Sequence, residues 1–291
     1  MKKKFNEIYQ DSIENPEKFW GEVSDDVFWF KKPKKILNKS NPPFYKWYED
    51  GITNTCYNAL DYHVEQGKGD KTALIYDSPI TGNKAKFTFN ELKTKVSKFA
   101  GALDNQGIKK GDRVIIYMPM IPEAVVAMLA CARIGAIHSV VFGGFASNEL
   151  ASRIDDSKAK VLVTASCGFE PGRTVEYRPL VDGALNLVKH KIEKLILFQR
   201  EGHEVKLNAP LEISWEEALS NAKEKDCVEM GANEYAYILY TSGTTGIPKG
   251  IVRDIGGHIV ALKWTMKNIY NIEEDDVWWS ASDIGWIVGH S

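Results

Sequence analysis

Four apolar stretches, separated by segments with helical periodicity, constrain the fold of this 291-residue chain more than any other feature. They run over Val114–Met118, His138–Phe142, Val161–Thr164 and Leu195–Phe198. Continuously apolar strands need cover on both faces, and crossover helices between parallel strands provide that cover. The alternation therefore predicts a doubly wound, mostly parallel α/β sheet with right-handed crossovers.

Short sequence motifs predict further strands and helices around the four apolar stretches. Thr72–Tyr76 and Lys86–Phe89 have the composition of short strands, and Thr88 with Glu91 forms a capping box ahead of a helix that stops at Gly107. The first crossover helix is predicted to begin at Pro122 and to end at Gly135. We expect its buried face to consist of Ala124, Val125, Met128, Leu129 and Ala132. A further helix is predicted near 215–222.

Aromatic residues are concentrated in the first 50 residues, where they alternate with prolines and lysines. The pattern resembles an extended arm. Aromatics interleaved with lysines can stack on single-stranded nucleic acid. However, the chain has 37 basic and 39 acidic residues, so no broad positive field supports that interpretation. We predict that the arm packs across the main body.

No targeting segment is recognisable in the sequence. Met1–Lys4 is basic, but the residues that follow include Glu7, Asp11 and Glu14 in place of an apolar signal-peptide segment. No apolar run reaches the roughly 20 residues that span a bilayer. The sequence predicts a cytoplasmic protein with neither nucleic-acid nor membrane partners, and it leaves the oligomeric state open.

The cysteines are far apart and lack the spacing of zinc ligands: Cys56, Cys131, Cys167 and Cys227. They are predicted to be reduced, buried thiols, and no metal ligands are predicted. A catalytic cysteine with His138 or His258 as its base is the alternative.

The most informative segment follows a predicted strand at Tyr235–Tyr240. It combines glycines that allow close backbone approach with hydroxyl donors and one mobile cation: Thr241, Ser242, Gly243, Thr244, Thr245, Gly246, Ile247, Pro248, Lys249 and Gly250. Such a loop suits a triphosphate. It departs from the Walker A pattern, because Pro248 stands where that pattern has glycine and Gly250 follows the lysine. A flexible linker is the alternative, but a strand before the loop and a strand and helix after it disfavour that interpretation.

This string resembles the signature loop of the adenylate-forming superfamily, which includes acyl-CoA synthetases. The resemblance implies the large-domain fold of that superfamily, with Lys249 as the catalytic cation. It also implies that Thr241 to Gly246 and Lys249 close on the β- and γ-phosphates of ATP. ATP, coenzyme A and Mg²⁺ are the implied cofactors, and a small carboxylate is the implied substrate. Because the reaction needs positioning and charge neutralisation, no covalent nucleophile is required.

Three further strings and the aromatic arm resemble acetyl- and propionyl-CoA synthetases: 140–145, 168–173 and 282–291. The resemblance implies an arm over residues 1–62 and an AMP-binding domain over 63–291. It gives Gly143, Gly144 and Arg173 to the coenzyme A site, although acetyl enzymes usually carry a second arginine where this chain has Glu170. It gives Trp286, Ile287 and Val288 to the acyl pocket.

Two features favour propionate over acetate as the substrate. Ile287 and Val288 make the predicted pocket wall apolar where acetyl enzymes commonly have a Val-Thr pair, and Arg253-Asp254 after the loop resembles the propionate branch. One methylene is worth only about 1–3 kcal/mol in such a pocket, so we expect acetate to be a slower substrate.

The resemblance also implies that the chain is an amino-terminal portion, incomplete at its carboxy terminus and lacking the carboxy-terminal domain. The adenine pocket, the hinge and a carboxy-terminal catalytic lysine would lie beyond Ser291. Two alternatives stay open, a non-catalytic fragment that binds nucleotide or coenzyme A, and a phosphotransferase with Asp283 as a nominal base or metal ligand.

Overall fold

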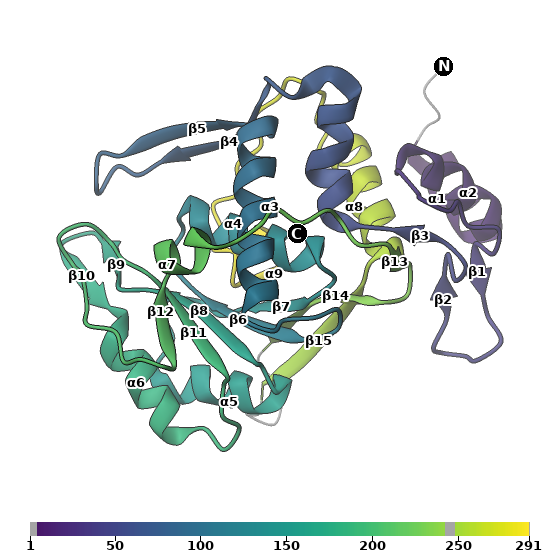
Figure 1. The fold of residues 1–291 in the computed structure, drawn as a ribbon. Helices are drawn as coiled ribbons and strands as arrows, with labels where there is room; N and C mark the ends of the chain where they lie inside the picture. The colour runs from purple at the N-terminus through teal and green to yellow at the C-terminus, as the bar shows by residue number, and fades with distance from the viewer. Residues whose placement is uncertain (1–4, 242–247, 291) are drawn as a thin grey trace.

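The computed structural model describes residues 5–241 and 248–290. Within them a seven-stranded sheet forms the centre of the molecule (Figure 1), in the order β12-β11-β8-β6-β7-β14-β15. Its strands are β6 (Arg113–Tyr117), β7 (Ile137–Val140), β8 (Val161–Ala165), β11 (Lys194–Phe198), β12 (Glu212–Ser214), β14 (Tyr235–Thr241) and β15 (Lys249–Asp254). All neighbours are parallel except β15, which is antiparallel to β14. The predicted doubly wound, mostly parallel sheet is confirmed.

Two hydrophobic clusters sandwich this sheet. Successive strand residues point alternately into the two clusters, so that Val163 joins one and Leu162 joins the other, as Ile116 and Ile115 do on β6. The first cluster is covered by α3 (Phe89–Asn105), α4 (Pro122–Arg133) and α7 (Trp215–Ser220), and the second by α5 (Ser147–Ser157) and α6 (Tyr177–Leu187). Cover on both faces explains why the strands are apolar throughout.

The capping signals are confirmed at α3. Thr88 Oγ1 accepts a hydrogen bond from the Glu91 amide at 3.2 Å, and Glu91 Oε2 accepts one from the Thr88 amide at 2.8 Å. The chain leaves the helix through Gly107, whose φ is +82°. The two predicted strands before α3 form an antiparallel hairpin, β4 (Thr72–Asp77) and β5 (Lys84–Thr88).

The predicted buried face of α4 is confirmed in part, because Ala124, Met128, Leu129 and Ala132 pack in the first hydrophobic cluster. Ala124 is fully buried, but Val125, Met128, Leu129 and Ala132 are only half-buried. The reason is that α4 contacts α3 on one side and strands β6 and β7 on the other, so its burial is not confined to one stripe. Its most buried apolar residues are Ala124, Val126, Ala127, Ala130 and Cys131.

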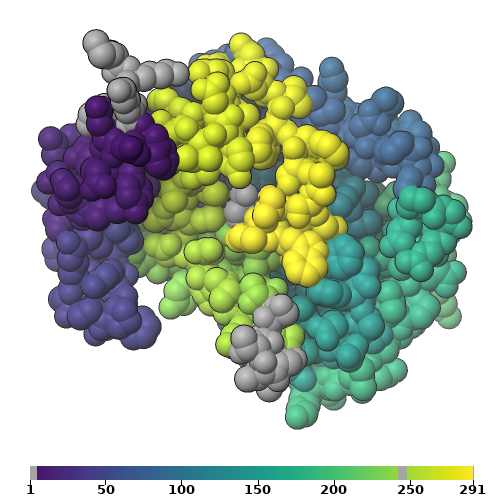
Figure 2. All heavy atoms as spheres, turned by 180° about the vertical axis from the view of Figure 1, so that it is seen from behind, coloured from purple at the N-terminus to yellow at the C-terminus, as the bar shows by residue number. Residues whose placement is uncertain are grey.

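The amino-terminal arm is less extended than predicted, since it begins with two helices, α1 (Phe5–Glu14) and α2 (Pro16–Val23). Its packing across the main body is confirmed. Trp20 and Trp29 pack in one cluster with Val260 of α8 (Gly256–Asn268), and the rings of Trp20 and Trp264 are 6.0 Å apart. Figure 2 shows the arm, in purple, lying against the yellow-green part of the chain that includes α8.

The remaining elements are short. They are η1 (Ser24–Asp26), β1 (Leu37–Asn38), β2 (Lys46–Trp47), β3 (Ile52–Thr53), η2 (Tyr57–Asp61), η3 (Val64–Lys68), β9 (Cys167–Glu170), β10 (Arg173–Glu176), β13 (Met230–Gly231) and α9 (Ile287–His290). None of the helices within 5–241 and 248–290 is long and apolar enough to cross a membrane.

Candidate functional site

The predicted phosphate loop lies between β14 and β15 in the chain, and we call these two strands the phosphate hairpin. In the antiparallel register Thr241 lies opposite Lys249, so the two ends of the loop are neighbours. Both residues are exposed, and Lys249 forms no ion pair with the described part of the chain. Its ammonium group is therefore available to a polyanion. The other predicted loop residues, Ser242, Gly243, Thr244, Thr245 and Gly246, lie outside the described residues.

Gly250 has a clear structural role in the hairpin. A Cβ atom at this position would lie 3.1 Å from the Ile238 side chain and 3.2 Å from the Tyr240 ring, both on the opposite strand. These separations are tighter than ordinary van der Waals contact. Glycine therefore lets β15 approach β14 closely beside Lys249.

The turn that follows β7 contains Gly143 and Gly144. A Cβ atom on Gly143 would overlap the hydroxyl of Tyr177, so the turn needs glycine there. Tyr117 Oη donates hydrogen bonds to the carbonyl oxygens of Phe145 at 2.7 Å and Gly143 at 3.2 Å. Burial raises the pKa of Tyr117 to about 12, which keeps the hydroxyl protonated as a donor. Gly144 itself is exposed, as a backbone ligand of a nucleotide must be.

The β9–β10 hairpin, which carries Arg173 at its tip, starts next to this turn. Its Gly168 also faces Tyr177, because a Cβ atom there would lie 3.1 Å from the Tyr177 hydroxyl. Tyr177 thus brings the two predicted coenzyme A segments together. Arg173 is exposed and paired with Glu170, with guanidinium nitrogens 2.6 and 2.7 Å from Glu170 Oε2. The side chain predicted to bind phosphate is engaged by a carboxylate in this structure.

The predicted acyl wall lies against the same turn. The Trp286 ring centroid is 6.2 Å from that of Phe142 and 6.1 Å from that of Phe145, and these two residues flank Gly143 and Gly144. A Cβ atom on Gly285 would lie 2.8 Å from the Phe142 backbone nitrogen. The structure therefore brings Trp286 to the turn.

The other two acyl-wall residues are not enclosed by the described part of the chain. Ile287 is 44% exposed and Val288 is 63% exposed, both on α9.

Asp283 has a structural role that the sequence did not suggest. Its Oδ1 accepts a hydrogen bond from the Gly285 amide at 2.7 Å, which fixes the turn before Trp286. Burial raises the pKa of the carboxyl group. The contact accounts for Asp283 without a phosphotransfer role.

Tyr117 and Tyr177 were missed by the sequence analysis. Tyr117 lies in an apolar stretch, where an aromatic residue is ordinarily part of the core, and Tyr177 lies between Glu176 and Arg178 at the start of α6. Their rings stack with centroids 4.9 Å apart. For Tyr117 the available signal was a hydroxyl at the end of a buried strand, since a buried tyrosine hydroxyl needs a partner.

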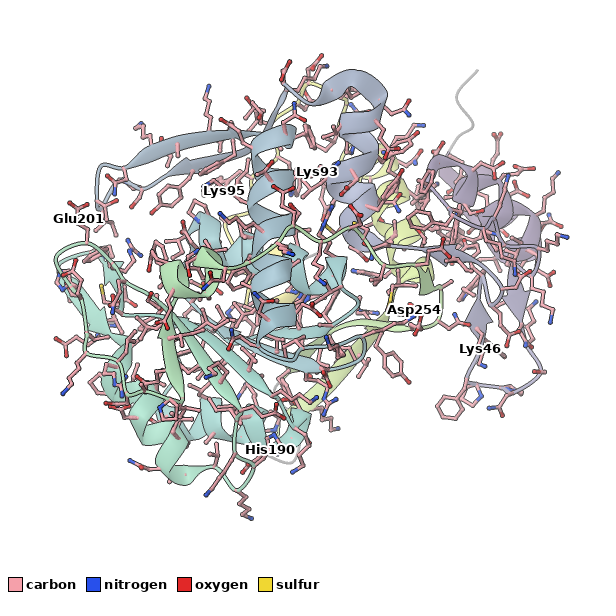
Figure 3. The ribbon with its side chains drawn as sticks, in the orientation of Figure 1. Lys46, Lys93, Lys95, His190, Glu201 and Asp254 are labelled. Atoms are coloured by element: carbon pink, nitrogen blue, oxygen red, sulfur yellow. The ribbon has the colours of Figure 1, made fainter. Side chains whose placement is uncertain are left out.

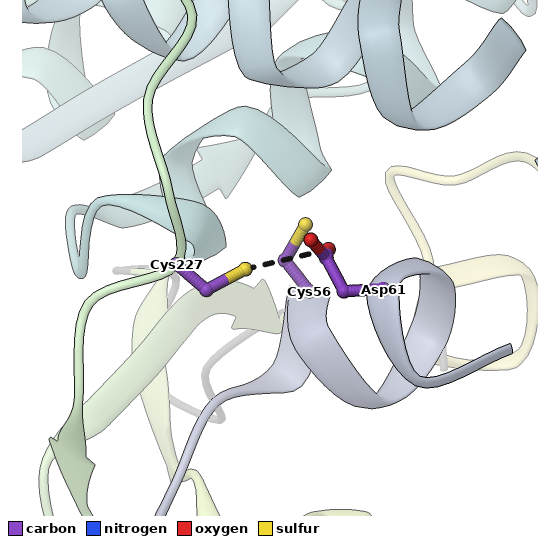
Figure 4. A group of neighbouring side chains, drawn as sticks. All are labelled: Cys56, Asp61 and Cys227. Carbon is purple, nitrogen blue, oxygen red and sulfur yellow. Dashed lines mark hydrogen bonds between the residues drawn. The ribbon is translucent and has the colours of Figure 1, made fainter. Parts of the chain in front are cut away.

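The cysteines follow the predicted pattern with one exception, because Cys56, Cys131 and Cys167 are buried but Cys227 is half-buried. The ligand atoms of Cys56, Asp61 and Cys227 lie within 4.8 Å of one another (Figure 4). The guanidinium group of Arg133 lies within this cluster and provides its positive charge.

Arg133 binds Asp61 through two nitrogens at 2.6 and 3.0 Å, and it also donates to the Cys227 sulfur at 3.2 Å. Lys93 of α3 (Figure 3) adds a second positive charge 3.3 Å from Asp61. We therefore assign the cluster to a buried ion pair.

The two histidines that were the alternative candidates for a cysteine's base form hydrogen bonds with other residues. His138 Nε2 and His290 Nε2 share a hydrogen bond of 2.9 Å, and His258 Nε2 bonds Tyr237 Oη at 3.0 Å. Burial lowers the pKa of His258 to about 4 and that of His290 to about 3. Within the described ranges neither His138 nor His258 hydrogen-bonds a cysteine, so the catalytic-cysteine alternative is not supported.

The fold and the arrangement of these segments define the class of protein. A doubly wound sheet carries an exposed lysine, Lys249, beside the glycine-rich sequence at its antiparallel edge, as expected of an adenylate-forming enzyme. The family model described as AMP-binding enzyme matches residues 60–291, and the one described as acetyl-coenzyme A synthetase N-terminus matches residues 5–59. The chain belongs to the AMP-binding enzyme family.

Named relatives are acyl-CoA synthetases. The chain is 53% identical over 281 residues to the mitochondrial acyl-CoA synthetase short-chain family member 3 of Rattus norvegicus, covering 96% of this chain and 41% of that protein. It is 41% identical over 292 residues to the acetyl-coenzyme A synthetase of Aeromonas hydrophila, covering 99% of this chain and 45% of that protein.

A solved structure shows the same fold. The acetoacetyl-CoA synthetase from Streptomyces lividans matches with a TM-score of 0.90 and 25% identity, over 99% of this chain and 44% of that one. The chain thus spans less than half the length of these relatives.

Proposed function

We propose that the whole protein activates a short-chain carboxylate with ATP as an acyl adenylate and then transfers the acyl group to coenzyme A, releasing pyrophosphate and AMP. The observation that carries this proposal is the phosphate hairpin, in which Lys249 lies exposed opposite Thr241 at the edge of the sheet, without an ion pair among the residues that the structure describes. Acyl-CoA synthetase is also what the names of the relatives state.

In the first step the carboxylate oxygen attacks the α-phosphorus of ATP and pyrophosphate leaves. Lys249 would neutralise charge that develops on the leaving group, and Thr241 would donate a hydrogen bond to it. The two residues supply no carboxylate, so we expect Mg²⁺ to be held mainly by ATP phosphate oxygens. Such a step needs no protein nucleophile.

In the second step the thiol of coenzyme A attacks the acyl carbon and AMP leaves. Gly144, which is exposed, would present backbone groups to the coenzyme A nucleotide, and the buried Gly143 would shape the turn beside it. Arg173 would bind a phosphate once its pairing with Glu170 opens. The contacts of Gly143 and Gly168 with Tyr177 support a shared site.

The substrate we propose is propionate, with acetate second. Ile287 and Val288 would give the pocket an apolar wall behind Trp286, and an extra methyl group gains apolar contact there. Only about 1–3 kcal/mol separates acids that differ by one methylene, so acetate should still react. A cytoplasmic location remains a prediction from the sequence.

The experiment is product analysis with the whole purified protein. Incubation with ATP, coenzyme A and propionate should yield propionyl-CoA, AMP and pyrophosphate, and kcat/KM for propionate should exceed that for acetate by about tenfold. Formation of ADP would instead indicate a phosphotransferase. Nucleotide or coenzyme A binding without product would indicate a binding protein.

A further inference from the structure

Arg153, on α5, is a nearly buried arginine that holds two aromatic rings. It is 4% exposed, and its Nη1 donates hydrogen bonds to the carbonyl oxygen and to Oε2 of Glu149, each at 2.7 Å. Its guanidinium carbon lies 4.8 Å from the ring centroid of Phe145 and 5.2 Å from that of Tyr240. Both distances are within the range of cation–π attraction. The guanidinium group therefore connects two rings from different segments.

The Tyr240 ring belongs to β14 of the phosphate hairpin. Tyr240 is the residue of β14 just before Thr241, and its hydroxyl donates to Asp156 Oδ2 at 2.7 Å, so the ring is held at both ends. It also lies under Gly250 of β15, which approaches closely enough that a Cβ atom would be 3.2 Å away. The position of Tyr240 thus sets the position of both strands where the loop begins and ends.

The Phe145 ring packs near Trp286 of the predicted acyl wall, and Phe145 directly follows the glycine turn in the chain. Its centroid is 6.1 Å from the Trp286 ring and 5.4 Å from the Phe142 ring. Phe142 and Phe145 bracket Gly143 and Gly144, so moving either ring moves the turn. One continuous set of contacts therefore runs from Tyr240 through Arg153 and Phe145 to Trp286.

An ion pair between Arg153 and Glu149 does not by itself require the guanidinium group to lie beside two aromatic rings. Glu149 is one helical turn from Arg153 and 38% exposed, and such pairs form on solvent-facing helices without aromatic neighbours. A planar guanidinium can stack on two rings while its nitrogens donate in the plane, which neither lysine nor methionine can do. The geometry thus uses properties that are specific to arginine.

We propose that Arg153 is a positioning residue that couples the phosphate hairpin to the acyl wall. This inference rests on the proposed function, because adenylate formation requires the triphosphate and the carboxylate to be held at the same time. Arg153 touches neither substrate and acts through Tyr240 and Phe145. Loss of the guanidinium should therefore weaken the use of ATP and change acyl selectivity together.

The test uses Arg153→Met in the whole protein, with carboxylate-dependent exchange of pyrophosphate into ATP as the assay. We expect the KM for ATP to rise at least fivefold and the propionate-to-acetate ratio of kcat/KM to change at least threefold. Arg153→Lys should restore less than half of either change. The matched control is Arg178→Met on α6, which also removes an ion-paired arginine but should leave both quantities within twofold of the wild type.

A second pair of variants keeps the proposal testable if Arg153→Met does not fold. Phe145→Leu removes the ring on the acyl side, and it should raise the KM for ATP at least threefold even though Phe145 is not part of the phosphate hairpin. Tyr240→Leu should change acyl selectivity by a similar factor. If each substitution alters only the substrate on its own side, the coupling is refuted. If the wild-type protein shows no carboxylate-dependent exchange, the proposed function itself fails.

Discussion

The central strands and the segment over residues 277–288 use similar apolar residues in opposite ways. Ile115 and Ile116 of β6 are 0% exposed, each pointing into its own cluster. Trp279 is 81% exposed and Val288 is 63% exposed. Helices cover both faces of β6, whereas the predicted acyl residues lie uncovered within the described part of the chain. The comparison teaches that the apolar residues that stabilise the sheet and those predicted to form the acyl wall are separate sets.

The separation leads to a simple expectation for mutations. Changes in the covered region should alter the free energy of unfolding. Changes at the exposed residues Lys249, Arg173 and Val288 should alter substrate use without altering stability. The following variants test that division, beginning with the largest effect.

The buried ion pair between Asp61 and Arg133 should show the largest effect. Asp61→Asn leaves the guanidinium, which is 1% exposed, without its carboxylate, and breaking such a pair costs about 3–5 kcal/mol. Urea unfolding followed by circular dichroism measures the change. Asp25→Asn is the control, because its pair with Lys32 is exposed and should be worth less than about 1 kcal/mol. Equal effects of the two substitutions would contradict the assignment.

Lys249→Ala should have the next-largest effect. It should slow the reaction without changing the free energy of unfolding. Loss of the cation that meets the leaving pyrophosphate is expected to slow carboxylate-dependent pyrophosphate exchange about 100-fold. The urea midpoint should not change, because Lys249 is exposed and unpaired within the described residues. Wild-type exchange in this variant would remove the hairpin from the mechanism.

The buried histidines should make the covered region sensitive to acid. The pKa of His258 falls from 6.5 to about 4 because burial disfavours the charged ring. The unfolded chain therefore binds a proton at a higher pH than the folded chain. Stability is fully present above about pH 6.5 and is lost progressively as the pH falls towards 4, by about 2.5 kcal/mol for this group at pH 4.5.

Thermal unfolding between pH 7.5 and 4.5 tests this point with His258→Gln as the comparison. The variant should lose less stability than the wild type over that interval, because one of the protonating groups is gone. His138 and His290 continue to titrate in both proteins, since burial also lowers their pKa values. Identical pH dependence of the two proteins would show that His258 does not contribute.

Arg173→Ala should produce a smaller and more selective effect. We expect the KM for coenzyme A to rise about tenfold while pyrophosphate exchange stays unchanged, since one charge-assisted contact to phosphate is lost. The matched variant Glu170→Gln should lower this KM, because it frees Arg173 from its 2.6 Å ion pair. A KM for coenzyme A that responds to neither substitution would refute the assignment of Arg173.

Val288→Thr should give the smallest effect. A hydroxyl in place of a methyl group reduces apolar contact with the methyl of propionate, and the ratio of kcat/KM for propionate over acetate should fall by about threefold. Trp279, which is also exposed in the 277–288 segment, provides a control through Trp279→Phe. An unchanged ratio for Val288→Thr would place this side chain outside the pocket.

The sequence was sufficient for the sheet because its signals are local and repeated. Apolar strands, the Thr88–Glu91 capping box and the Pro122 helix start all appear in the structure. The buried face of α4 was only partly predictable, because burial there depends on contacts with α3, which are non-local. The contact of Gly143 and Gly168 with Tyr177 was likewise invisible, since it joins three separate segments. The roles assigned to the site residues remain predictions, because they depend on the substrates.

Exchange of labelled pyrophosphate into ATP, measured on the whole protein without coenzyme A, tests the central claim most directly. The account predicts exchange that requires a carboxylate, is faster with propionate than with acetate, and falls about 100-fold in Lys249→Ala while the unfolding midpoint is preserved. Exchange that does not depend on a carboxylate, or that persists without the lysine, would contradict it.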